Sequence, residues 1–169
     1  SLIYKRGGYD MSDKPMFYRI KQNFARPRLQ EIEATVVAEL DKINLAQKIK
    51  PGDKVGITVG SRGIANILTI LKTIVGYVKK AQGQPFLLAG MGSHGGGTPE
   101  GQIELLESYN ITEETVGAPI LACGESRRIA ATETGLAVYA LESVRQVDSI
   151  LVVNRVKTHT SFKGDVESG

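Results

Sequence analysis

Apolar positions recur along the chain at two spacings, and the alternation between them predicts an α/β fold. Leu29 to Leu45 and Ile64 to Gln82 carry apolar side chains close to the helical period. Short apolar or β-branched runs separate them, as in βαβ units, so we expect a mostly parallel, Rossmann-like sheet with helices on both faces. The expected strands cover 16–24 at an edge and 54–59, 85–89, 119–122 and 149–153, with the last of these buried.

Local signals refine this pattern. Thr98 is expected to cap a helix that has Pro99 at its first position and stops near Asn110. Thr-Glu-Glu-Thr, from Thr112, has the form of a capping box and predicts a short helical turn. Gly83 is expected to close the helix over 64–82. A small hairpin insertion is predicted at 127–133 and 136–141, and a helical turn at 142–147.

Composition and charge narrow the class of protein. The 169 residues suffice for one domain, expected over 16–169 after an irregular segment over 1–15. Lysines and arginines are dispersed at a net charge of +3, which argues against nucleic acid as the main partner. No apolar run approaches the length of a membrane span. The single cysteine, Cys123, is expected to be buried, and the lack of an internal disulfide fits a reducing, cytoplasmic compartment.

The stretch from Gly90 to Thr98 contains five glycines and His94, one of two histidines in the chain. It follows a strand-like run and precedes a helix-like one, which places it at the carboxyl end of a strand, where open α/β sheets bind ligands. Glycines there let the backbone approach a ligand and offer N–H groups to an anion. The alternative is a tight turn with a solvated histidine.

Three expected strands end in polar loops that share the carboxyl edge of the sheet. These loops hold Ser61 and Arg62, then Ser93 and His94, and finally residues 154–169 with His159. Because carboxyl ends of parallel strands meet at one edge, we expect both histidines there. Two neutral imidazoles suit reversible proton transfer on two faces of one substrate.

Positive charge on this edge predicts an anionic ligand. Arg62, with a helix amino end behind it, suits a carboxylate or phosphate, and its alternative is a surface salt bridge. Lys157 and Lys163 flank His159 and either bind an anion or remain solvated. No Walker loop, Cys-x-x-Cys or His-Glu-x-x-His motif is present. The candidate catalytic residues are His94 and His159, the candidate binding residues are Ser61, Arg62, Ser93, Gly95, Gly96, Lys157 and Lys163, and no metal ligand is predicted.

The three loops read Gly-Ser-Arg-Gly, Gly-Ser-His-Gly-Gly-Gly-Thr and Lys-Thr-His-Thr-Ser-Phe-Lys-Gly. In their order and spacing the chain resembles the amino-terminal domain of the nickel-dependent lactate racemase family, from about Arg19 onward. The resemblance implies an isomerase that racemises or epimerises a 2-hydroxy acid. It also implies a nickel-pincer nucleotide, derived from nicotinic acid and tethered to a lysine, which takes hydride from the α-carbon while a histidine takes the hydroxyl proton.

The same resemblance assigns residues. His94 matches the first catalytic histidine, His159 the second, and Arg62 the arginine on the substrate or cofactor side. The tethering lysine and nickel-binding histidine would lie beyond Gly169, so we expect a fragment, truncated at its C-terminus, whose partner is the missing C-terminal domain. Val59 replaces a family aspartate, and the segment after Lys163 is longer and more acidic, so the substrate need not be lactate.

Two other functions remain open. The same loops would serve a non-catalytic anion- or nucleotide-binding module, or the wall of a cleft completed by a second domain. The resemblance favours the enzyme, but the parts it places beyond Gly169 are needed for turnover. We therefore expect the 169-residue chain alone to be inactive and to contain no nickel.

Overall fold

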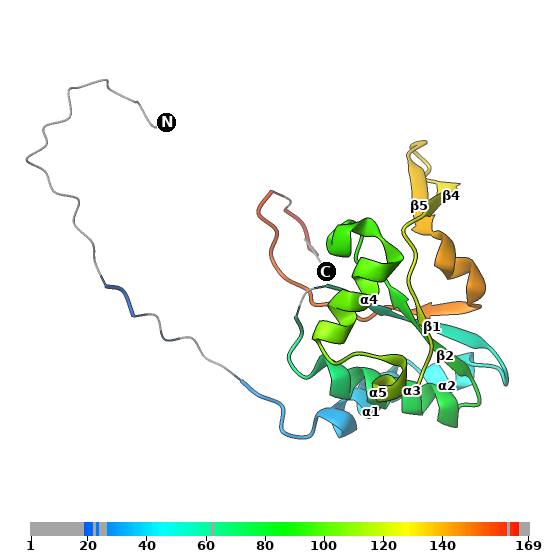
Figure 1. Ribbon diagram of the computed structural model, residues 1–169. Helices are drawn as coiled ribbons and strands as arrows, with labels where there is room; N and C mark the ends of the chain where they lie inside the picture. The colour runs from blue at the N-terminus through cyan, green and yellow to red at the C-terminus, as the bar shows by residue number, and fades with distance from the viewer. Residues whose placement is uncertain (1–18, 22, 24–26, 62, 162, 166–169) are drawn as a thin grey trace, which may run out of the picture.

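A four-stranded parallel sheet forms the centre of the molecule. The computed structural model describes residues 19–21, 23, 27–61, 63–161 and 163–165. The strands are β1 (Lys54–Val59), β2 (Gln84–Ala89), β3 (Ile120–Leu121) and β6 (Ser149–Leu151), in the order β3-β2-β1-β6. Helices flank the sheet and a separate antiparallel hairpin projects beside it, so the expected α/β class is confirmed (Figure 1).

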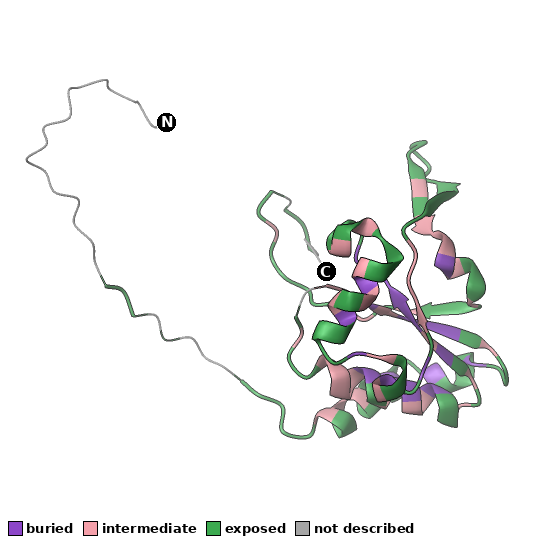
Figure 2. Cartoon of the chain, viewed as in Figure 1, coloured by how far each residue is buried: buried purple, intermediate pink, exposed green. Residues whose placement is uncertain are grey.

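The helices supply most of the remaining core. In the view of Figure 1, α1, α2, α3 and α5 lie together below the sheet, and α4 stands above them. Side chains of α3 at positions 71, 74, 75 and 78 are buried because this spacing repeats every helical turn. They pack in one cluster with the buried side chains of β1 and β2, and the ribbon at buried residues is coloured purple in Figure 2. The bounds are α1 (Ile32–Lys42), α2 (Leu45–Lys48), α3 (Ile67–Lys80), α4 (Pro99–Ser108) and α5 (Glu113–Val116).

One side-chain hydrogen bond ties α1 to α3. The Tyr77 hydroxyl donates to Oδ1 of Asp41 at 2.5 Å. This hydrogen bond, followed by burial and the negative charge of Asp41, raises the pKa of Tyr77 above its usual value. The neutral phenol is therefore the form that the α1–α3 contact favours.

The ends of two helices differ from the prediction. The helix expected over 29–45 is interrupted, since Asn44 adopts a left-handed conformation and separates α1 from α2. The end of α3 is also shifted, because Gln82 rather than Gly83 has a positive φ. The N–H of Gly83 donates to Val78 O at 3.0 Å, which closes the helix in a Schellman arrangement. A Cβ on Gly83 would lie 2.8 Å from Ile49 Cγ2, so this glycine is required for packing instead.

The predicted caps of α4 and α5 are confirmed. Thr98 Oγ1 accepts a hydrogen bond from the N–H of Gly101, and Pro99 is the first residue of α4. Thr112 and Thr115 form a reciprocal capping box at α5. Asn110, with φ of 59°, follows the end of α4 as expected. These interactions were predictable because each depends on side chains within a few residues of the backbone groups that they satisfy.

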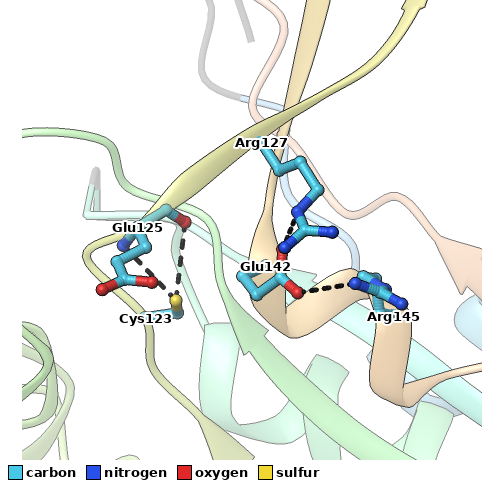
Figure 3. Close-up of polar contacts among 5 residues, drawn as sticks. All are labelled: Cys123, Glu125, Arg127, Glu142 and Arg145. Carbon is cyan, nitrogen blue, oxygen red and sulfur yellow. Dashed lines mark hydrogen bonds and ion pairs between the residues drawn. The ribbon is translucent and has the colours of Figure 1, made fainter.

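The predicted hairpin is present but lies largely in solvent. It consists of β4 (Ser126–Ala131) and β5 (Ala137–Leu141), with a bulge between Arg128 and Ala130. All of β4 is exposed. At its base, Glu142 of the 3₁₀ turn η2 (Glu142–Gln146) accepts from Arg127 Nε and Arg145 Nη1, both at 3.0 Å (Figure 3). This carboxylate joins the hairpin to the turn that leads into β6.

The strand expected over 149–153 is not buried, because the strand order places β6 at the edge of the sheet, where it pairs with β1 over only three residues. Ile150 is 47% exposed and Val152 63% exposed. The strand expected over 16–24 lies mostly outside the described residues, and residues 19–21 and 23 belong to no helix or strand.

Within the described ranges, no helix is both long enough and apolar enough to cross a membrane.

Candidate functional site

The loops after β1, β2 and β6 meet around one cavity. Its volume is about 230 Å³. The three loops at the carboxyl edge therefore lie together as predicted, and Ser61, His94 and Lys157 line the same cavity. The lining residues are Gly60, Ser61 and Ile64 after β1, Gly90, Met91 and His94 after β2, and Val153, Asn154, Arg155 and Lys157 after β6.

The glycine-rich loop after β2 is built by close backbone packing. Gly92, Gly95, Gly96 and Gly97 all have positive φ, which favours glycine. A Cβ on Gly101 of α4 would lie 2.0 Å from Gly95 O. On the other side, a Cβ on Gly124, which follows β3, would lie 2.5 Å from Gly97 O. The loop is thus held between α4 and the segment after β3, and this packing explains Gly95, Gly101 and Gly124 without any ligand, whereas Gly97 is explained by its positive φ.

His94 stands at the start of the 3₁₀ turn η1 (His94–Gly97). Its backbone N–H donates to Met91 O at 3.2 Å. Met91 is buried, whereas His94 is exposed and lines the cavity. The fixed backbone therefore presents an imidazole to a solvent-accessible cavity, which is the placement that a proton-transfer group requires.

Beneath the same loop lies a polar residue that the sequence pattern did not predict. Gln102 of α4 is 1% exposed, and its Nε2 donates to Gly92 O at 3.5 Å. Its Oε1 has no hydrogen-bond partner among the described residues. The available signal was its helical register with the buried Leu106, four residues later. Gln102 thus supports the start of the glycine-rich loop from below.

The loop after β1 is tied to two other elements. The Tyr109 hydroxyl donates to Ser61 O at 2.9 Å. Arg155 Nη1, from the loop after β6, donates to Gly63 O at 3.3 Å. Arg62, the predicted anion-binding residue, lies outside the described residues. Arg155 was missed as a site residue, since only the folded arrangement brings it beside the Ser61 loop.

The second histidine is positioned differently. His159 is half-buried, and its Nδ1 accepts a hydrogen bond from the N–H of Ser161 at 3.0 Å. In a neutral imidazole this bond favours the tautomer with the proton on Nε2. His159 is not among the residues that line the cavity, although Lys157, two residues earlier, is. The structure therefore brings His94, but not His159, to the shared space.

The other predicted site residues that the structure describes do not line the cavity. Ser93, Gly95 and Gly96 belong to the glycine-rich loop beside it, and Lys163 is exposed farther along the chain. Cys123 follows β3 and is half-buried rather than buried, with Sγ within 3.5 Å of the Glu125 backbone (Figure 3). We therefore take the residues that line the cavity as the candidate site.

The charged residues that line the described cavity are all basic. Arg155 and Lys157 are cationic and His94 is titratable, whereas no aspartate or glutamate is present among the described lining residues. Such a lining favours an anion. In the part of the chain that the structure describes, no three His, Cys, Asp or Glu side chains are grouped so that they could hold a metal ion.

Comparison with known proteins gave no match. No protein-family model, no curated protein and no solved structure is similar to this chain. The chemistry of the cavity therefore carries the functional proposal.

Proposed function

We propose that this chain is the amino-terminal catalytic part of a nickel-pincer-dependent 2-hydroxy-acid racemase or epimerase. The observation that supports the proposal is the cavity at the carboxyl edge, where loops from three strands bring together His94, a hydroxyl group and two cations. This combination suits an anionic substrate that must lose and regain a proton. Ligand binding at this edge is also the common arrangement in open α/β sheets.

The roles of the residues follow from their positions. His94 lines the cavity and would take the proton from the substrate hydroxyl. Ser61 and Lys157 line the cavity from two different loops and would hold the anionic groups of the cofactor. His159 would serve the opposite face of the substrate, which requires its imidazole to turn towards the cavity from the place where Ser161 now holds its Nδ1.

The implied cofactor fits this site in part. The cationic lining suits the anionic groups of a nucleotide derived from nicotinic acid, with Lys157 and Ser61 as the residues that would hold them. When bound, the nickel-pincer nucleotide would supply the acceptor for hydride from the α-carbon. Among the described residues, no three His, Cys, Asp or Glu side chains are grouped so that they could hold nickel, and we assign no nickel ligand to this site.

The proposal extends to the setting of the protein. We place it in the cytoplasm, because a single cysteine fits a reducing compartment. Its proposed partners are a small 2-hydroxy acid and the C-terminal domain that the resemblance implies.

A chiral assay tests the proposed function. The natural polypeptide that contains this sequence would be produced together with enzymes that build the cofactor, and interconversion of 2-hydroxy acid enantiomers would be measured beside nickel content. His94→Ala is expected to lower turnover by about 10²- to 10⁴-fold at unchanged nickel content. Binding of acid without any interconversion would instead favour the alternative, a non-catalytic anion-binding module.

A further inference from the structure

Arg155 is the cation of the cavity whose position the structure explains most fully. It lies in the loop after β6, lines the cavity, and donates through Nη1 to Gly63 O at 3.3 Å. This hydrogen bond joins the loop after β6 to the loop after β1 and orients the guanidinium. A guanidinium has five N–H donors in a rigid fork, so a single backbone bond leaves the geometry for a carboxylate intact.

Three residues of the cavity lining carry large apolar side chains, and each of the three loops contributes one of them. Ile64 and Val153 are half-buried and Met91 is buried. They come from the loops after β1, β6 and β2, respectively. A ligand that contacts both Arg155 and these three side chains therefore needs an anionic end and a hydrocarbon part.

The volume limits the size of that ligand. About 230 Å³ is below the roughly 300–1,000 Å³ typical of sites for drug-sized molecules. A short-chain acid fits such a space, whereas a whole nucleotide would have to extend out of it. Because no described lining residue carries negative charge, an anion meets no repulsion there.

We propose that Arg155 binds the carboxylate of the substrate, and that Ile64, Met91 and Val153 bind its substituent. The site then selects short aliphatic 2-hydroxy monocarboxylates. The assignment of the ligand as a 2-hydroxy acid rests on the proposed function, but the pairing of Arg155 with a carboxylate rests on the cavity alone. Arg155 acts here as a specificity-determining residue.

Direct binding tests the proposal without any need for turnover or cofactor. Chemical-shift titrations of the 169-residue chain would compare glycolate, lactate, 2-hydroxybutyrate, malate and inorganic phosphate. Affinity is expected to rise about fourfold for each added methylene from glycolate to 2-hydroxybutyrate, since each methylene buries further apolar surface. Malate is expected to bind more weakly than 2-hydroxybutyrate, and phosphate more weakly than lactate.

Variants isolate the role of the guanidinium. Arg155→Gln is expected to weaken 2-hydroxybutyrate binding by about 10-fold or more, and Arg155→Lys by less, since the charge remains but the fork is lost. Arg127→Gln removes an equal charge from the hairpin and is expected to leave binding unchanged. Tyr109→Phe removes the hydrogen bond from the Tyr109 hydroxyl to Ser61 O, so it reveals any effect that comes only from releasing this loop.

Each contrary outcome is distinct. Equal binding by wild type and Arg155→Gln, equal losses in Tyr109→Phe and Arg155→Gln, or no acid binding to the wild type would overturn the role of Arg155. Tighter binding of malate or phosphate would overturn the monocarboxylate preference. Failure of the racemase proposal would look different, because acids would still bind through Arg155 while His94→Ala left the chiral assay unaffected.

Discussion

The two histidine-bearing loops are held in place by different means. The loop with His94 is fixed by its backbone, since Gly95 and Gly97 pack against Gly101 and Gly124 at distances that exclude a side chain. The loop with His159 follows an exposed edge strand, and its residues are mostly exposed. There the imidazole is oriented by its own chain, through the N–H of Ser161.

This difference bears on function. A group fixed by packed backbone keeps its place whether or not a ligand is present, as preorganised catalysis requires. A group in a largely exposed loop after an edge strand has few buried contacts to lose, so its position changes more easily when a ligand binds. We therefore expect His94 to be ready for proton transfer in the free protein, and His159 to take its position when the site is filled.

The largest expected effect separates these two roles. In the racemase assay, His94→Ala and His159→Ala should each reduce turnover by about 10²- to 10⁴-fold, because each removes one of the two proposed proton-transfer groups. The unfolding midpoint should stay unchanged, since neither side chain belongs to the core cluster. Chiral chromatography and thermal unfolding would be measured on the same preparations. An active His94→Ala variant would remove the assignment of His94, and an active His159→Ala variant would leave a one-histidine mechanism.

The next effect probes the backbone packing of the His94 loop. Gly101→Ala should destabilise the protein by about 3 kcal/mol or shift the loop, because its Cβ would lie 2.0 Å from Gly95 O. Gly76→Ala, in the middle of α3, is the matched control. A Cβ there meets nothing within 4 Å, so alanine should stabilise by roughly 0.5–1 kcal/mol. Denaturant unfolding would measure both, and equal effects of the two substitutions would contradict the packing described for the loop.

The same contrast explains what was predictable from the sequence. The bounds of β1 agree with the prediction, because a turn precedes this buried run and a glycine follows it. The meeting of the loops was predictable from the parallel sheet alone. The exposure of β6 was not, because it depends on which strand occupies the edge. Arg155 and Gln102 belong to no sequence motif. Arg155 contacts Gly63, which is distant in the chain, and Gln102 contacts Gly92 in the loop that packs on α4, so both roles depend on the folded structure.

A smaller effect concerns the cap that joins the His94 loop to α4. Thr98→Ala removes the acceptor for the Gly101 N–H, so we expect a loss of about 1 kcal/mol in the free energy of unfolding. Thr98→Ser keeps the oxygen and should recover most of this loss. Denaturant unfolding would measure both variants. A loss in Thr98→Ser as large as that in Thr98→Ala would show that the methyl group, rather than the cap, matters.

The smallest effect concerns the point where the His159 segment leaves the sheet. Thr58 of β1 accepts a hydrogen bond from the N–H of Val153 through Oγ1 at 2.9 Å. Thr58→Val keeps the β-branched shape that suits a strand but removes this acceptor, so global stability should fall by only about 0.5–1.5 kcal/mol.

The local consequence of Thr58→Val is the sharper test of the comparison. Amide hydrogen exchange at Val153 should accelerate by about two- to tenfold beyond any change in global unfolding, because its N–H loses its partner. The amide of His94, bonded to Met91 O, should exchange as before, since packed glycines and not β6 hold its loop. Faster exchange at both amides would mean that the two loops move as one unit, and the division into a fixed and an adjustable histidine would then fail.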